Sequence, residues 1–180
     1  MADWKLLGMA ALVQLAVLTQ GAVKPARKGP VVVYSEMHDH VAAKAQVLWD
    51  ITNAKLDDEG NPSAKKMKPA DWIKLRAALT DLSASLNRLG GAKSFVVRKA
   101  DQQILDEQTP GGAKPADIQR HIDANPAGFR QYATALARQI DGIGKAADRR
   151  DLKTVYEAAG ELDGQCETCH QTFWFPKDAQ

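Results

Sequence analysis

The pattern that most restricts how this chain can fold lies near its C-terminal end, where Cys166, Cys169 and His170 follow one another closely. On an α-helix, residues three and four positions apart share one face. A helix across this segment therefore presents two thiols and one imidazole on a single side. Cys-x-x-Cys-His is the spacing at which haem is attached, with two thioether bonds to the cysteines and the imidazole as an axial iron ligand. The sequence predicts one covalent haem c.

Two other chemistries use the same residue types. A structural zinc site needs four ligands, and because the chain has only two cysteines the remaining ligands would be histidines such as His38 and His40. A thioredoxin-like dithiol follows a strand in a βαβ arrangement, and no such pattern precedes Cys166. Haem attachment is therefore the favoured interpretation, and zinc binding and dithiol chemistry are its alternatives.

Composition limits the class of protein. The chain has 180 residues, of which 44% are hydrophobic and 26% charged, as expected of one globular domain. The formal net charge of +2 gives no reason to expect a nucleic-acid partner. Both cysteines belong to the haem pattern, so we expect no structural disulfide.

Residues 1–22 have the features of an export signal. Lys5 precedes an apolar run over residues 6–18, and the small residues Gly21 and Ala22 follow. A run of this length predicts a signal peptide that is removed, with an uncleaved membrane anchor as the alternative. Contact with a membrane is expected only if the segment is retained.

Four stretches carry apolar residues at helical spacing. Ser35, Asn125 and Asp151 are residue types that cap helix N-termini, and Pro69 suits a first helical turn. We expect helices over residues 35–56, 69–89, 126–147 and 152–174.

These helices predict an all-α fold, an antiparallel four-helix bundle over residues 36–176 with the haem attached to the last helix. An extended segment over residues 23–35 precedes it, and a tail over 177–180 follows. The long connection 92–124 is expected to contain a helical piece at 100–107 and a short helix at 115–123. No strand pattern is evident.

A family resemblance is carried by residues 129–173. Phe-Arg-Gln-Tyr-Ala is followed by Ala-Asp-Arg-Arg-Asp-Leu, by Val-Tyr-Glu-Ala-Ala-Gly and then by the haem pattern. In this the chain resembles the class II c-type cytochromes, the cytochrome c-prime family, which carry the pattern on the last helix of a bundle. The resemblance implies export before haem attachment, and therefore a periplasmic location.

The resemblance also implies where to look for a second axial ligand. In this family the distal residue comes from the start of the first helix, and Met37 stands there. His40 is the alternative ligand and His38 a weaker one, and the iron could also lack a protein ligand on this side. Trp174 occupies a position four residues after the haem histidine where the family often has arginine.

Two functions follow from these possibilities. Ligation by His170 and Met37 predicts a low-spin periplasmic monohaem cytochrome that transfers single electrons to other redox proteins in transient complexes. Such a protein is not an enzyme. The alternative is a five-coordinate haem that binds or senses nitric oxide or carbon monoxide. A homodimer through the first helices is compatible with either function.

Overall fold

The computed structural model describes residues 29–105 and 107–175. The expected signal peptide over 1–22 and the tail over 177–180 lie outside the described residues. The described part is mainly α-helical, as predicted. Its elements are β1 (Val31–Val32), the π-helix η1 (Ser35–Ala42), α1 (Ala43–Asn53), the 3-10 helix η2 (Ala64–Lys66), α2 (Pro69–Gly90), β2 (Phe95–Val96), α3 (Pro115–Ala124), α4 (Pro126–Asp148) and α5 (Leu152–Phe173).

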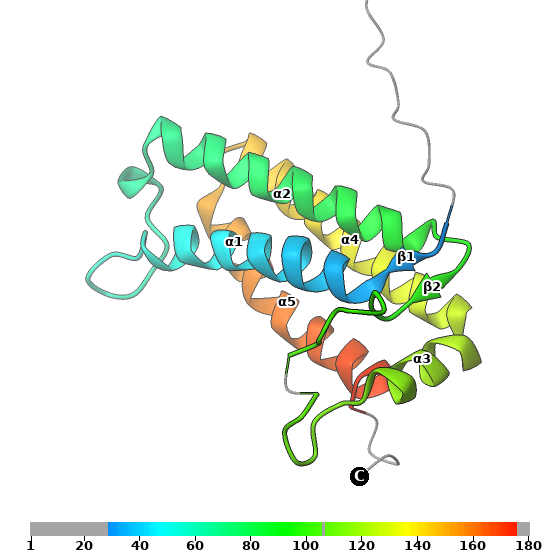
Figure 1. Cartoon of the computed structure of the whole chain (residues 1–180). Helices are drawn as coiled ribbons and strands as arrows, with labels where there is room; N and C mark the ends of the chain where they lie inside the picture. Colours follow the sequence, from blue (N-terminus) through cyan, green and yellow to red (C-terminus); the bar gives the residue numbers. More distant parts are fainter. Residues whose placement is uncertain (1–28, 106, 176–180) are drawn as a thin grey trace, which may run out of the picture.

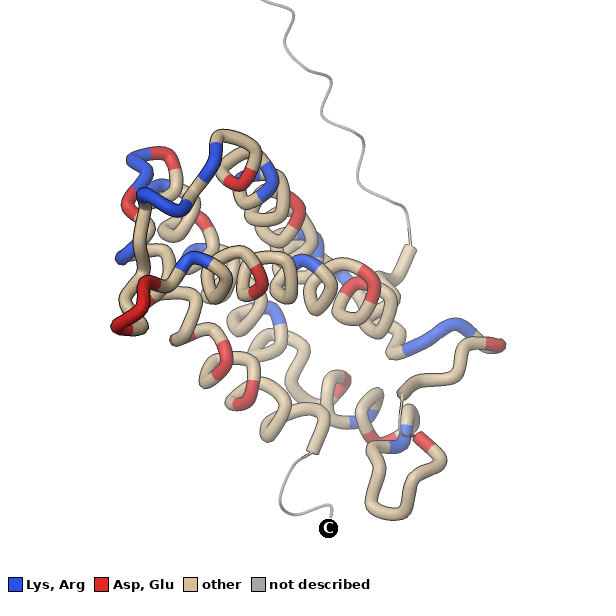
Figure 2. The backbone as a smooth tube through the Cα atoms, turned by 90° about the vertical axis from the view of Figure 1, so that its left-hand side faces the viewer, with Lys and Arg blue, Asp and Glu red and all other residues tan. Residues whose placement is uncertain are grey.

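The long helices pack alongside one another (Figure 1). α1 contacts α2 and α5, and α4 lies between α2 and α5, so that each long helix has two long neighbours. η1 continues into α1 and also packs against α2. Acidic and basic residues are interspersed along the helices (Figure 2). No helix within residues 29–105 and 107–175 is long and apolar enough to cross a membrane.

Local capping explains where α4 and α5 begin. The Asn125 side chain accepts a hydrogen bond from the backbone N–H of Gly128 at 2.9 Å. The Asp151 carboxylate does the same for Thr154 at 3.1 Å. Each satisfies an N–H group that the first helical turn leaves without a partner. The predicted starts of these two helices are therefore confirmed.

The predicted cap at Ser35 is wrong. Ser35 is the first residue of η1, and the residue before it, Tyr34, is already helical and makes no side-chain capping bond. The Ser35 hydroxyl instead accepts a hydrogen bond from the Gln102 side chain at 3.2 Å. A long-range contact has taken the place of the local one. The first helix also ends at Asn53, three residues earlier than expected.

The end of α4 contains the one non-glycine residue of the described chain with a positive φ, Arg150 at 57°. Its N–H donates to the Ala147 carbonyl at 3.0 Å, and the N–H of Asp151 donates to the Ala146 carbonyl at 3.0 Å. These two bonds define a Schellman motif, which normally has glycine at the left-handed position. They end α4 and turn the chain into α5.

The connection between α2 and α4 differs most from expectation. Residues 100–107 form no helix among those described. The Gln102 side chain accepts from the Lys99 N–H at 3.2 Å, and the Glu107 carboxylate accepts from the Ile104 N–H at 2.9 Å. Side chains that bond nearby backbone in this way compete with helical hydrogen bonding. β1 and β2 also pair as a short parallel ladder, which the sequence did not indicate.

Buried apolar residues form two clusters. The first cluster lies between the long helices, and its members are Val41, Ala45, Leu48, Ile51, Leu75, Leu79, Leu82, Leu86, Ala137, Ile140, Ile143, Ala146, Ala147, Val155, Ala159 and Leu162. The second cluster joins the connection to the start of α4 and the end of α5. Its members are Val33, Leu89, Phe95, Val97, Ile104, Ile118, Ile122, Phe129, Ala133 and Phe173.

Candidate haem site

Helix α5 carries all three residues of the haem pattern in its last turns. Cys166, Cys169 and His170 are each half-buried, and both thiols are free. Cys169 packs against the second cluster, as does Trp174 one turn beyond it. The expected helix is therefore present, and it holds the three side chains between solvent and the apolar end of the fold.

Burial alters the acidity of both thiols. The pKa of Cys166 is raised, first by burial and then by the Asp163 carboxylate. The pKa of Cys169 is raised to about 11, again by burial first and then by Cys166. Thiols of this kind stay protonated at neutral pH, whereas redox-active cysteines have a lowered pKa. The surroundings do not favour dithiol chemistry.

The imidazole of His170 is shifted towards its neutral form. Burial lowers its pKa, and the Glu167 carboxylate opposes the shift without reversing it. A neutral imidazole has a free lone pair on one ring nitrogen, which is what iron ligation requires. Two protonated thiols and a neutral imidazole on one helical face are thus a donor set that fits covalent haem.

The zinc alternative receives no support. Within residues 29–105 and 107–175, no group of three or more histidine, cysteine or acidic side chains could hold a metal ion. His38 and His40 are both exposed. His38 lies 2.9 Å from the Asp39 carboxylate and stacks on the Tyr34 ring, with centroids 5.1 Å apart.

Met37 lies at the junction of the two clusters. It is half-buried and packs against both of them. It belongs to η1, whose hydrogen bonds close over one residue more than those of an α-helix. The helical spacing used to place Met37 on the face of Val41 therefore does not strictly apply in this segment. Met37 and Cys169 nevertheless contact the same cluster.

Two further residues at this end of α5 were not singled out by sequence reasoning. His121 of α3 is half-buried, and its Nδ1 lies 3.3 Å from the Phe173 carbonyl. Because a carbonyl can only accept, the imidazole must donate. Phe173 itself is 2% exposed and packs edge-on against Phe129 and Tyr132, with centroids 5.2 and 5.9 Å away. Only the helical position of Phe173 gave a signal in the sequence.

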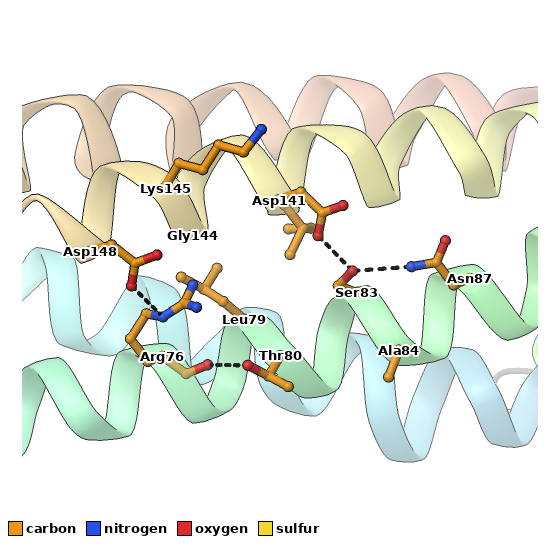
Figure 3. Close-up of a pocket in the computed structure, with 11 residues that line it drawn as sticks. Arg76, Leu79, Thr80, Ser83, Ala84, Asn87, Asp141, Gly144, Lys145 and Asp148 are labelled. Carbon is orange, nitrogen blue, oxygen red and sulfur yellow. Dashed lines mark hydrogen bonds and ion pairs between the residues drawn. The ribbon is translucent and has the colours of Figure 1, made fainter. Parts of the chain in front are cut away.

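Two surface grooves are lined by none of the three residues of the haem pattern. One of about 480 Å³ runs between α2 and α4 and contains none of the three pattern residues (Figure 3). It is crossed by an ion pair from Arg76 to Asp148 at 2.9 Å and a hydrogen bond from Ser83 to Asp141 at 2.7 Å. Another of about 420 Å³ lies between α1 and α5. The chemistry of the donor set, not a cavity, identifies the site.

Comparison with known proteins gives the same class. The family model described as Cytochrome C′ matches residues 61–174, which include the haem pattern. The chain belongs to this family, and it is therefore a haem-binding c-type cytochrome. Neither the curated proteins nor the solved structures compared with the chain gave a match. The family match begins after η1, so it says nothing about Met37.

Proposed function

We propose that the protein is a periplasmic monohaem cytochrome that transfers single electrons, with His170 and Met37 as the two axial ligands of a low-spin iron. The observation that carries the proposal is the grouping of two protonated thiols and a neutral imidazole on one half-buried face of α5. Met37 on η1 packs against the same cluster as Cys169.

We infer that the four long helices form an antiparallel bundle around this site. Their mutual contacts and their alternating directions in Figure 1 support the inference. Helices packed in this way build cofactor sites from side chains on facing helices. Here α5 would supply the covalent attachment, and Met37 of η1 packs against the same cluster as Cys169 of α5.

Each protein group has a definite task. The thiols of Cys166 and Cys169 would hold the haem through two thioether bonds, each formed by addition of S–H across a vinyl group, which needs no oxidant. His170 would bind the iron through its imidazole from the same helix, and Met37 would bind it through its thioether sulfur from η1. The haem would supply one-electron chemistry at its iron. Covalent attachment and apolar packing then keep the group in one orientation during electron transfer.

The alternative is a five-coordinate haem that binds nitric oxide or carbon monoxide. Membership of the cytochrome c-prime family supports it, because such proteins are typically five-coordinate. Met37 would then shield the distal face without binding. His40 is exposed, which weighs against this residue as the distal ligand. It remains the alternative to Met37 in a low-spin protein.

Absorption spectra of the purified holoprotein separate these functions. We expect a low-spin spectrum in both oxidation states and slow, incomplete carbon monoxide binding in the reduced state. Met37→Ala should give a high-spin protein that binds carbon monoxide rapidly. Met67→Ala is the matched control, because Met67 is also half-buried but packs only against the first cluster. A wild-type protein that is already high-spin would refute Met37 ligation and favour gas binding.

Location and partners form part of the same proposal. Export and removal of residues 1–22 would place the protein in the periplasm, where small redox proteins exchange electrons in brief encounters. Sequencing the N-terminus of protein from a periplasmic fraction tests this directly. An intact N-terminus in a membrane fraction would show an anchor instead.

A further inference from the structure

Three consecutive residues before Met37 are each held in place. The Tyr34 N–H donates to the Val97 carbonyl at 2.9 Å. The Ser35 hydroxyl accepts from Gln102 at 3.2 Å. The Glu36 carboxylate accepts from both Nε and Nη2 of Arg88, the shortest of these bonds being 2.7 Å. The start of η1 is thus fixed by contacts far away in the sequence.

Most of these anchors come from one part of the connection, residues 94–105, which we call the distal brace. Its Ser94 carbonyl accepts from the Val31 N–H at 3.0 Å, and β2 pairs with β1. The Leu105 N–H donates to the Tyr34 hydroxyl at 3.2 Å. The distal brace therefore follows the chain leading into η1 from Val31 to Ser35, and only Arg88 lies outside it.

On the side facing α3, backbone groups of the distal brace are hydrogen-bonded by one side-chain amide. Gln119 of α3 accepts from the Val97 N–H through Oε1 at 2.9 Å and donates to the Phe95 carbonyl through Nε2 at 3.3 Å. The same Nε2 donates to Asp123 at 2.9 Å, which fixes the orientation of the amide. Gln119 thus pairs with the free side of β2 as another strand would, satisfying backbone groups that burial would otherwise leave unbonded.

The distal brace also reaches the other side of the site. Its buried side chains Phe95, Val97 and Ile104 belong to the second cluster, against which both Met37 and Cys169 pack. A shift of the distal brace would therefore move the surroundings of the thioether sulfur and of the attached helix together. Packed interiors transmit such shifts because they contain little free volume.

We propose that Gln119 is a positioning residue, which acts through the distal brace to keep Met37 within reach of the iron. The proposal rests on the proposed function, in which Met37 is the distal ligand. Among the described residues Gln119 makes no hydrogen bond to Met37, so its effect must pass through Val97 and Tyr34. Its expected consequence is on ligand occupancy, which a purely structural residue would leave unchanged.

The test is carbon monoxide association with the reduced holoprotein, measured by stopped flow together with the spin state. Gln119→Ala should raise the rate by roughly tenfold, the population change expected when about one net hydrogen bond is lost. Gln119→Glu retains the acceptor for the Val97 N–H, so its association rate should lie between those of Gln119→Ala and the wild type. Gln131→Ala, an exposed glutamine of α4, is the matched control and should leave the rate unchanged.

A milder variant protects the test if Gln119→Ala folds poorly. Tyr34→Phe removes only the hydroxyl that accepts from Leu105, and it should raise the rate by about two- to fivefold, the effect of part of one hydrogen bond. If the wild type is low-spin and both the Gln119→Ala and the Tyr34→Phe variants bind carbon monoxide at its rate, the positioning role of Gln119 is wrong. Ligation by Met37 would then still stand. A high-spin wild type would overturn Met37 ligation, and this inference with it.

Discussion

In the turn between α4 and α5, one substitution is expected to increase the free energy of unfolding, whereas most substitutions decrease it. Arg150 has a φ of 57°, a conformation that side chains with a Cβ rarely adopt, and it is exposed. The two Schellman bonds around it use only backbone atoms. Replacing Arg150 with glycine would therefore keep those bonds and remove the steric conflict at Cβ.

The size of the effect follows from two opposing contributions. A left-handed conformation costs an ordinary L-residue roughly 1–2 kcal/mol. Glycine loses more backbone freedom on folding than arginine does, and this loss offsets about 0.4–1 kcal/mol of the gain in stability. Arg150→Gly should therefore raise the free energy of unfolding by about 0.5–1 kcal/mol.

Urea unfolding followed by helical circular dichroism measures this change. We expect the midpoint to rise with an unchanged slope, which indicates a change in stability rather than in the surface exposed on unfolding. Arg149→Gly is the matched control, because Arg149 is also exposed but has a φ of −82°. Glycine there brings flexibility without relieving strain, and the midpoint should fall. Equal losses from both substitutions would refute the reasoning, since the two positions would then share one backbone conformation.

Three other substitutions test individual contacts. Asn125→Ala removes the side-chain cap of α4 and should cost about 1 kcal/mol in urea unfolding; no change would mean that the cap does not form in solution. Phe173→Ala empties a site that is 2% exposed and loses the edge-on contact with Phe129, so we expect a loss of about 3–5 kcal/mol, measured in the same way. The hydrogen bonds from Thr154 lower the pKa of Asp151, so its capping contribution is complete above the ordinary value of 3.8 and is lost as the pH falls through the lower, folded value. Asp151→Asn should therefore differ most from wild type in unfolding experiments near neutral pH and least in strong acid.

The parts of the fold that were predictable are those set by neighbouring residues. Asn125 and Asp151 cap helices within three residues of themselves, and Pro69 begins α2 because its missing N–H costs nothing there. These helix starts depend only on nearby residues, so they do not depend on where the helix packs in the fold. The capping role expected of Ser35 is wrong, because its hydroxyl accepts a hydrogen bond from Gln102, which is remote in the chain.

The parts that could not be predicted depend on pairings between distant segments. Val31 pairs with Phe95, and the single amide of Gln119 satisfies both a donor and an acceptor beside β2. Neither stretch alternates apolar and polar residues long enough to indicate a strand. The π-helical form of η1 was equally hidden, because a hydrophobic stripe near 3.6 residues per turn does not reveal a local change of hydrogen bonding.

The candidate site also has one part that local spacing predicts and another that depends on contacts between distant segments. Cys166, Cys169 and His170 are predicted from spacing alone, because one helix orients all three, and the family match covers that helix. In our proposal the distal side is built from η1, the distal brace and α3, and the family match begins only after η1. In the proposed function, ligation by Met37 decides between electron transfer and gas binding, and Tyr34, Ser35 and Glu36 before it are held by contacts with other segments. The segment on which our proposal depends, η1, is therefore the one for which both the family pattern and the local sequence carry the least information.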